Sequence, residues 1–174
     1  MCALLPSFLR GVEDAYPRTE AGVCETKVLP AARLMLAKSP DAYFGSNNRL
    51  FGKLFRYIQS NDIPMTAPVE ARMQPGVMVF YCDDASAKRA DLKDTPEVVL
   101  QSVPARTVAA IGIRGSYTSE AYAENLAKLR EWLKGHPELR EIGEPYAVYW
   151  NSPFVPGFLK RSEVHIPVEK TPAR

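Results

Sequence analysis

Residues 63–73 carry the clearest structural pattern in the sequence, and they read Ile63-Pro64-Met65-Thr66-Ala67-Pro68-Val69-Glu70-Ala71-Arg72-Met73. Apolar residues fill every odd position, and polar residues or prolines fill every even one. This period of two is typical of a β-strand. Proline cannot donate a hydrogen bond to a neighbouring strand, so two prolines on one side require an edge or a bulge within this strand.

A helical pattern lies just before this strand, over residues 47–59. Its apolar side chains recur at the spacing of one helix face, at Leu50, Phe51, Leu54, Phe55 and Ile58. Ser46 or Asn47 is expected to cap the helix, because their side-chain oxygens can accept the free N–H groups of its first turn. Pro64 cannot continue the helix and marks its end.

The rest of the chain repeats the same order of elements. Strand patterns are found at residues 23–29, 33–37, 77–82, 97–103, 107–114, 146–150 and 162–168. A second helix is predicted at 119–134, capped by Thr118 or Ser119. The sequence therefore predicts an α+β fold of duplicated β-β-α-β-β modules. Their strands form one antiparallel sheet or distorted β-barrel, and both helices pack on its outside. Gly112, inside a strand, predicts a bulge or a close approach of another segment.

Composition limits the class of protein. The chain has 174 residues, of which 46% are hydrophobic and 24% charged, as in an ordinary globular domain. We expect a loose arm or short helix at 1–20 and a single domain at 21–174. The net charge is only +2. No segment of the sequence has the concentration of basic residues that is typical of a nucleic-acid-binding protein.

Other features bear on location and on covalent chemistry. No apolar run approaches the ~20 residues of a membrane span, and residues 1–18 lack the pattern of a signal peptide. We therefore expect a cytoplasmic protein without a membrane span, either a monomer or a weak homodimer. The three cysteines form no Cys-x-x-Cys pair, which argues against a zinc site and excludes covalent c-type haem.

Three stretches together carry a resemblance to a known family. They are 51–58 with Asn61, 63–69, and 149–153 with 160–164. In this combination the chain, over roughly residues 23–168, resembles the SOUL/haem-binding-protein family. Ser162 stands where that family often has Asn, and Trp150 is an insertion in its Tyr-Asn pairing. The resemblance implies the duplicated fold and a soluble, non-enzymatic protein. Its cofactor would be a non-covalent haem or other tetrapyrrole with weak or no axial ligation.

A tetrapyrrole needs a flat apolar surface and cations for its propionates. The first helix offers both. We hypothesise that Leu50, Leu54 and Tyr57 border the porphyrin, with Lys53 and Arg56 near its carboxylates. The alternative is an ordinary solvated helix face.

Two histidines are available as iron ligands. His136 follows the second helix, where imidazole commonly satisfies helix carbonyls. His165 lies in the last strand on the same face as Glu163, and it is the candidate metal ligand. The alternative for His165 is a hydrogen-bonded sheet residue. Met65 and Tyr57 are further candidates.

Glu163 supports a second function. The gyrase-inhibitor-like effector-binding domains, a neighbouring group with the same fold, use a glutamate in a comparable strand to hold cationic ligands. By this resemblance, Glu163 would be the counter-ion of an aromatic cation. Aromatic side chains would form the walls, with Tyr81, Tyr146, Tyr149 and Trp150 as candidates. The alternative is an exposed strand carboxylate.

A third function is a hydrolase, because some proteins of this fold are described as such. Glu163 with Tyr146 would then perform acid–base chemistry. The chain has no Gly-x-Ser-x-Gly, His-Glu-x-x-His or phosphate-binding loop motif, and we expect no enzymatic activity.

Overall fold

The computed structural model describes residues 13–44, 49–152 and 154–171. Across these ranges the protein is α+β, with helices α1 (Leu50–Ser60), α2 (Asp84–Ala87) and α3 (Ser119–Lys134). The strands of the first half are β1 (Glu13–Asp14), β2 (Cys24–Leu29), β3 (Ala32–Lys38), β4 (Thr66–Ala67), β5 (Val69–Arg72) and β6 (Val77–Tyr81). The strands of the second half are β7 (Val99–Val103), β8 (Arg106–Arg114), β9 (Leu139–Glu141), β10 (Tyr146–Tyr149) and β11 (Arg161–Lys170).

The order of strands in the main sheet confirms the duplication. It runs β2-β8-β11-β10-β5-β6-β3-β7, and β9 pairs with the far end of β11. On this path the first half contributes β2, β3, β5 and β6, and the second contributes β7, β8, β10 and β11. Exchanging β2 with β7, β3 with β8, β5 with β10 and β6 with β11 gives the same order read backwards. The halves are thus related by a pseudo-twofold axis between β10 and β5, and every strand pairing along this path is antiparallel.

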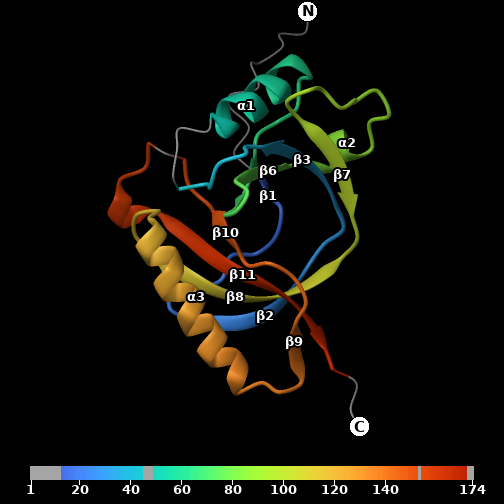
Figure 1. Ribbon diagram of the computed structural model, residues 1–174. Coiled ribbons are helices and arrows are strands. Elements are labelled where there is room, and N and C mark those ends of the chain that lie inside the picture. The colour runs from blue at the N-terminus through green and yellow to red at the C-terminus, as the bar shows by residue number, and fades with distance from the viewer. Residues whose placement is uncertain (1–12, 45–48, 153, 172–174) are drawn as a thin grey trace, which may run out of the picture.

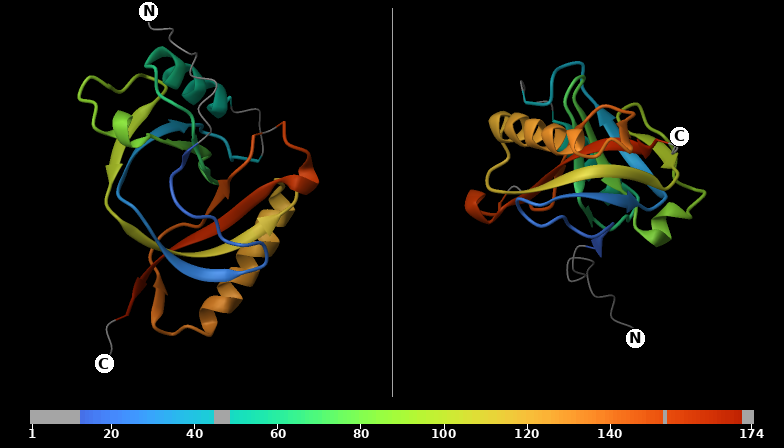
Figure 2. Two further views of the ribbon diagram at one scale, coloured as in Figure 1. Left: turned by 180° about the vertical axis from the view of Figure 1, so that it is seen from behind. Right: turned by 90° about the horizontal axis from the view of Figure 1, so that it is seen from below.

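The sheet curls into a half-barrel, with α1 and α3 on its outer side (Figure 1). Helix α1 packs on β3 and β6, and α3 packs on β8 and β11. Because side chains alternate along a strand, each strand sends one set outward under these helices and one set into the concave interior. The two views of Figure 2 show residues 13–20, drawn in blue, crossing the concave side, away from both helices.

The segment 63–73, predicted as one long strand, is divided at Pro68 into β4 and β5. The predicted long strand is therefore interrupted, but β5 lies between β10 and β6 and is not an edge. Both of its faces are covered, since Ala71 is buried outward and Glu70, 1% exposed, points inward. Glu70 is opposite Val79 and Val148 of the interior cluster.

The helix boundaries follow the predictions closely. Helix α3 spans the predicted residues, and the Thr118 hydroxyl accepts a hydrogen bond from the Ala121 N–H at 3.1 Å. Helix α1 begins at Leu50, three residues later than predicted. The proposed caps Ser46 and Asn47 lie outside the described residues.

The segment that follows residue 12 is not a loose arm. Tyr16 is 4% exposed and Thr19 is 7% exposed, both on the concave side. The predicted close approach at Gly112 is confirmed, because a Cβ there would lie 2.2 Å from the Glu20 carbonyl oxygen. Among the described residues, no helix is both long enough and apolar enough to cross a membrane.

Candidate functional site: a tyrosine-lined hollow and a buried carboxylate chamber

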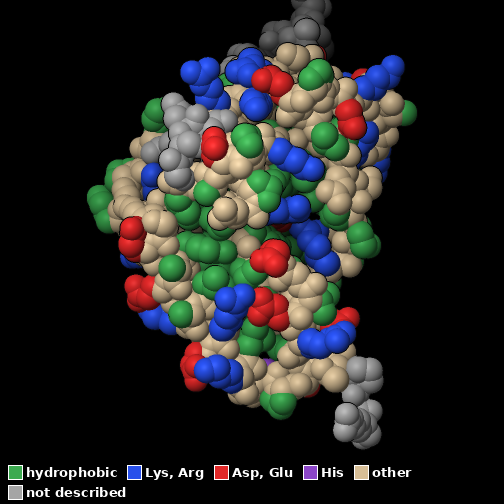
Figure 3. Space-filling model, viewed as in Figure 1, with side chains coloured by type: hydrophobic (Ala, Val, Ile, Leu, Met, Phe, Trp, Pro, Cys, Tyr) green, Lys and Arg blue, Asp and Glu red, His purple; other side chains and the backbone are tan. Residues whose placement is uncertain are grey.

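A hollow lined by tyrosines lies on the outer side of the sheet, between the two long helices. Tyr149 points outward from the end of β10, and its ring stacks on Tyr117 at 4.2 Å between centroids. The rings of Tyr43 and Tyr149 are 6.1 Å apart, and Tyr122 of α3 closes the far side. Figure 3 shows hydrophobic side chains gathered here between α1 and α3. We call this surface the tyrosine hollow.

The hydroxyl groups of the tyrosine hollow are held neutral. Tyr117 donates a hydrogen bond to the Arg161 carbonyl at 2.8 Å and accepts one from the Asn151 N–H at 3.0 Å. Burial raises the pKa of Tyr43 and of Tyr122 to about 12. The Tyr149 hydroxyl is buried without a hydrogen-bond partner in the described part of the chain.

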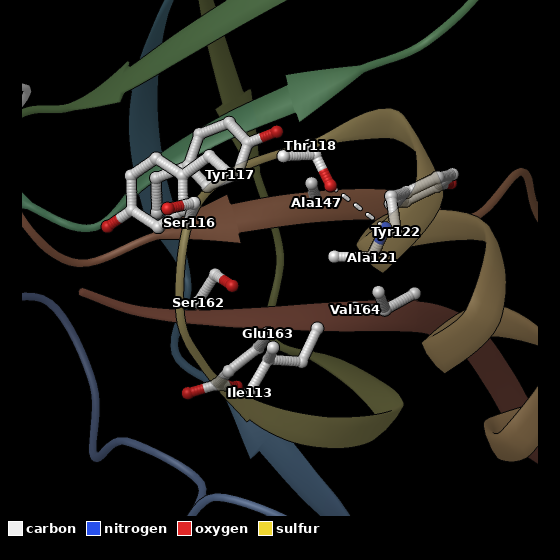
Figure 4. A pocket seen from close by; sticks show the side chains of 11 residues that line it. Ile113, Ser116, Tyr117, Thr118, Ala121, Tyr122, Ala147, Ser162, Glu163 and Val164 are labelled. Carbon is white, nitrogen blue, oxygen red and sulfur yellow. Dashed lines mark hydrogen bonds between the residues drawn. The ribbon is translucent and has the colours of Figure 1, made fainter. Parts of the chain in front are cut away.

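A cavity of about 10 Å³ lies at the base of the hollow, between α3 and strands β8, β10 and β11 (Figure 4). This volume suits one water. A larger ligand must therefore rest on the open surface above it. Figure 4 also shows that the Glu163 side chain points to the other side of β11 from Ser162 and Val164.

Exposed aromatic side chains occur in segments that adjoin the hollow. The connection between β10 and β11, whose ends Asn151 and Arg161 hydrogen-bond Tyr117, carries Phe154, 95% exposed, and Phe158, 72% exposed. Phe44, 38% exposed, lies 6.3 Å from the Tyr122 ring between centroids. Lys160 from the same connection places its ammonium 5.0 Å from the centre of the Tyr117 ring. The region therefore combines flat apolar surface with a cation.

The residues predicted on the first helix are divided between core and surface. Leu50, Leu54 and Tyr57 are buried in the cluster between α1 and the sheet, where Met65 packs against them. Their side chains are thus not an open porphyrin surface. Lys53 is half-buried, and Arg56 is exposed with its guanidinium 3.2 Å from the Glu97 carboxylate.

The interior of the half-barrel contains a second polar site, centred on Glu163. This carboxylate is 1% exposed and accepts hydrogen bonds from four residues. Its Oε1 accepts from the Thr19 N–H at 2.8 Å and from the Trp150 indole N–H at 2.8 Å. Its Oε2 lies 2.6 Å from the Lys27 ammonium and 2.6 Å from His165 Nε2. We call this site the carboxylate chamber.

The hydrogen bonds fix the protonation states in the carboxylate chamber. Burial lowers the pKa of His165 despite its carboxylate neighbour, so the imidazole is neutral. It then donates from Nε2 to Glu163, while Nδ1 faces the Tyr146 hydroxyl at 3.3 Å. Burial alone would raise the pKa of Glu163, but His165 and Lys27 outweigh it and lower the pKa to about 2.

A second buried carboxylate repeats this arrangement. Glu70 accepts hydrogen bonds from the Tyr81 hydroxyl and from the Arg106 guanidinium, the latter at 3.0 Å. Arg106 also donates to the Tyr81 hydroxyl at 2.6 Å. Each inward glutamate therefore has its own cation, which is required for buried charges to be tolerated.

The histidines are both engaged within the described structure. His136, at the end of α3, contacts the Trp132 carbonyl oxygen through Nδ1 at 2.9 Å. His165 is fully buried, on the opposite side of the sheet from the tyrosine hollow. Among the described residues, no group of three or more His, Cys, Asp or Glu side chains could hold a metal ion.

Sequence reasoning grouped Glu163 with His165 and gave Tyr81, Tyr146, Tyr149 and Trp150 as candidate walls. The structure brings Tyr81, Tyr146 and Trp150 into the interior with Glu163. Tyr149 was wrongly included, because it points to the outer side and lies in the tyrosine hollow. Sequence reasoning missed Thr19 and Lys27, which come from more than a hundred residues away. Alternation in β2 was the available signal: Lys27 points inward to Glu163 while Val28, 67% exposed, points to solvent. It also missed Tyr43, Tyr117 and Tyr122, because they lie in connections and at a helix start.

The fold and these two sites define a small duplicated half-barrel with a ligand-sized aromatic surface outside and a charged chamber inside. A family model described as SOUL heme-binding protein matches residues 18–167, and the chain belongs to that family. No curated protein is close enough in sequence to count as a relative.

Solved structures share the fold at low sequence identity. The C-terminal domain of EcmrR has a TM-score of 0.67 at 15% identity, covering 86% of this chain and 98% of that one. A hydrolase from Listeria innocua has a TM-score of 0.56 at 12% identity, covering 87% and 94%. An uncharacterised conserved protein from Listeria innocua has a TM-score of 0.59 at 11% identity, covering 86% and 93%. At these identities the likeness concerns the fold alone.

Proposed function

We propose that this protein binds haem or a related tetrapyrrole non-covalently, with the ring lying on the tyrosine hollow. The observation that carries the proposal is the aromatic surface between α1 and α3, on a chain whose family is described as heme-binding. Tetrapyrroles are flat and apolar, and stacked tyrosines with exposed phenylalanines supply matching surface.

The same surface offers groups for the propionates. Lys160 lies at the edge of the hollow. Lys53 forms no ion pair with any described residue and lies on α1, which adjoins the hollow because Tyr43 packs against the cluster beneath this helix. A lysine ammonium near the surface gains a modest Coulomb energy from pairing with a propionate carboxylate. We assign Lys160 as the first such partner and Lys53 as the second.

No histidine is positioned to ligate iron in this site, since His165 is behind the sheet and His136 contacts a helix carbonyl. Binding should then depend on the ring and its carboxylates, not on the metal. Ligation by His165 would require breaking its contacts with Glu163 and Tyr146.

A titration of the protein with haemin and with metal-free protoporphyrin tests the proposal, read by absorbance and by tryptophan quenching. We expect dissociation constants for the two rings within threefold of each other. The double variant Phe154→Ser, Phe158→Ser should weaken both at least tenfold. Val28→Ser, an exposed position on β2, is the matched control and should change nothing. Equal affinity of the double variant and the natural protein would reject the site.

We further propose a binding role and not catalysis for the carboxylate chamber. A carboxylate with a pKa of about 2 is a weak general base at neutral pH. Tyr146, the other acid–base candidate, has a pKa raised by burial and is 6% exposed. Both features oppose the hydrolase alternative.

One observation favours a second binding function, for aromatic cations at Glu163. The Lys27 ammonium already lies 2.6 Å from Glu163 and 5.2 Å from the centre of the Tyr16 ring. The chamber therefore has the chemistry of a cation cage, filled by a side chain of the protein. Lys27→Ala vacates the space of the ammonium and should create affinity for benzylammonium, a small aromatic cation, and Lys27→Ala with Glu163→Gln should abolish it. Absence of benzylammonium binding to Lys27→Ala would reject this second function.

A further inference from the structure

The segment of residues 13–20, here called the strap, closes the concave side of the half-barrel. Its central side chain, Tyr16, is 4% exposed and inserts among aromatic residues of the interior. The Tyr16 ring lies 5.3 Å from Trp150, 5.7 Å from Tyr81 and 6.0 Å from His165, between centroids. A part of the chain remote from these residues in sequence thus fills the middle of the carboxylate chamber.

Beside the ring, the strap presents hydrogen-bond donors to the buried charge. The Thr19 N–H donates to Glu163 Oε1 at 2.8 Å, and the Thr19 hydroxyl contacts Oε2 at 3.1 Å. Outside them, the Arg18 guanidinium lies 4.9 Å above the Trp150 ring. The strap thus supplies an aromatic ring, two donors and a cation, which is the set of groups that a small ligand of this chamber would need.

The strap is joined to the sheet by few backbone hydrogen bonds, although its side chains are packed and hydrogen-bonded in the chamber. Its strand β1 pairs only with the two residues of β4, and a single bridge joins Ala21 to Gly112. Gly22 follows with φ of 83°, a conformation that favours glycine and turns the chain into β2. The main sheet is hydrogen-bonded through eight strands without the strap. The strap can therefore leave without breaking the half-barrel.

Two features show that the strap is an imperfect occupant. The Tyr16 hydroxyl and Arg106 Nη1 are both buried without a partner among the described residues. Leaving buried polar groups unpaired is unfavourable, and native interiors rarely do so. A cavity of about 130 Å³, lined by Arg18, Thr19, Glu20, Trp150 and Arg161, also opens beside the strap. The chamber thus has polar groups to satisfy and an opening at its margin.

We propose that residues 13–20 act as a displaceable internal ligand that keeps the carboxylate chamber closed. The molecule that displaces them carries an aromatic ring and an N–H donor group, replacing Tyr16 and Thr19 respectively. Arylalkylamines, in which a short alkyl chain joins a phenyl ring to an amino group, are the simplest such class. The ring occupies the slot between Trp150 and Tyr81, and the amine donates to Glu163. The ligand class rests on the second proposed function, whereas the displacement of the strap does not.

Gly112 provides a way to displace the strap without altering the chamber. A Cβ at this position would lie 2.2 Å from the Glu20 carbonyl and 2.5 Å from that of Thr19, both backbone atoms. Gly112→Ala should therefore push the end of the strap off β8. Gly52→Ala is the matched control, because its Cβ would meet only the end of the Arg56 side chain, at 3.5 Å.

Trp150 reports whether the strap is in place. The chain has two tryptophans, so a Trp132→Phe background leaves Trp150 as the single fluorophore. Trp150 is 5% exposed beneath the strap. In this background, Gly112→Ala should raise the acrylamide quenching constant at least threefold while circular dichroism is unchanged. Quenching equal to that of Gly52→Ala would overturn the displaceable strap.

Binding of phenethylamine, toluene and ethylamine then tests the ligand class. With Gly112→Ala, phenethylamine should bind at least tenfold more tightly than to the natural protein and than toluene or ethylamine. Tyr16→Ala, which empties the slot, is the second variant should Gly112→Ala fail to fold. Toluene binding as well as phenethylamine to these variants would overturn the ligand class. Protoporphyrin affinity should be unchanged in Gly112→Ala, which separates this inference from the tetrapyrrole proposal.

Discussion

Glu163 is an acid whose environment favours its charged form. Burial penalises the carboxylate, but Lys27, His165, Thr19 and the Trp150 indole all donate to it. Hydrogen bonds to a charged group stabilise it roughly twice as strongly as neutral ones. Glu163 therefore joins four parts of the chain by hydrogen bonds: the strap, β2, β11 and the connection after β10.

This environment predicts a loss of stability in acid. The pKa of Glu163 is about 2 in the folded protein, below its ordinary value of 4.5, so its stabilisation is present above pH 4.5 and lost as the pH falls toward 2. The pKa of His165 is also lowered, from 6.5, so its contribution is lost as the pH falls below 6.5. In both cases the unfolded chain binds more protons. Urea unfolding from pH 8 to pH 2 should show stability falling across both windows.

Glu163→Gln should remove the lower of these windows. Its unfolding free energy should be about 3 kcal/mol smaller at pH 7, because Lys27 loses its buried partner. Below pH 4.5 its stability should decline less steeply than that of the natural protein. Glu138→Gln, an exposed carboxylate without an ion pair among the described residues, is the control. If the stability of Glu163→Gln fell as steeply below pH 4.5 as that of the natural protein, Glu163 would not be the source of this pH dependence.

At the residue scale, sequence alone placed some partners and not others. Alternation in the last strand put Glu163 and His165 on one face, and this is how they lie. Alternation did not show that Lys27 approaches that face, because a lysine that points inward cannot be distinguished by pattern from any other polar residue in a strand. Such pairings depend on sheet order, which a strand pattern does not contain.

Helix α1 is held by its apolar stripe, and this bears on the porphyrin hypothesis made from sequence. Leu54 is fully buried between the helix and the sheet. Leu54→Ala should lower the unfolding free energy by about 3 kcal/mol through the cavity it leaves. Protoporphyrin affinity, measured where the variant is folded, should be unchanged. The exposed Gln59→Ala is the control for stability, and a tenfold weaker porphyrin affinity in Leu54→Ala would return α1 to the binding surface.

Helix α3 depends on its first-turn cap. The Thr118 hydroxyl accepts the Ala121 N–H, which otherwise has no helical partner. Thr118→Ala should lower stability by about 1 kcal/mol, seen as a lower urea midpoint. Ser119→Ala, one residue later, should have less than half that effect. Equal losses from the two substitutions would mean that the cap is not the source of the stability.

Element by element, the long periodic segments were predictable and the short ones were not. The residues of α3 were identified because its helical pattern extends over 16 residues, and those of β6 because they form an uninterrupted apolar run. Strands β1 and β9 have two and three residues, too few for a period to be recognised. Pro68 was seen to disturb its strand, yet only the structure shows that it divides β4 from β5 in a covered part of the sheet.

For the whole molecule, the palindromic strand order explains how one fold presents two distinct sites. Each strand contributes one set of side chains to the outer side and one to the interior. The helices cover the outer side incompletely, and the tyrosine hollow lies between them. The strap crosses the interior side (Figure 2). Element order predicted this architecture. The hollow was not predicted, because its four tyrosines come from three separate parts of the sequence, around residues 43, 117–122 and 149.

The central claim is that a tetrapyrrole binds outside the half-barrel, on the tyrosine hollow. Backbone amide shifts recorded by NMR during titration with protoporphyrin test it most directly, because ring currents act only on nearby nuclei. We predict large shifts at Tyr43, Tyr117, Tyr122 and Tyr149, with the amides of Lys27 and His165 unchanged. Large shifts at Lys27 and His165, with the tyrosine amides unmoved, would place the ligand in the carboxylate chamber and contradict the account.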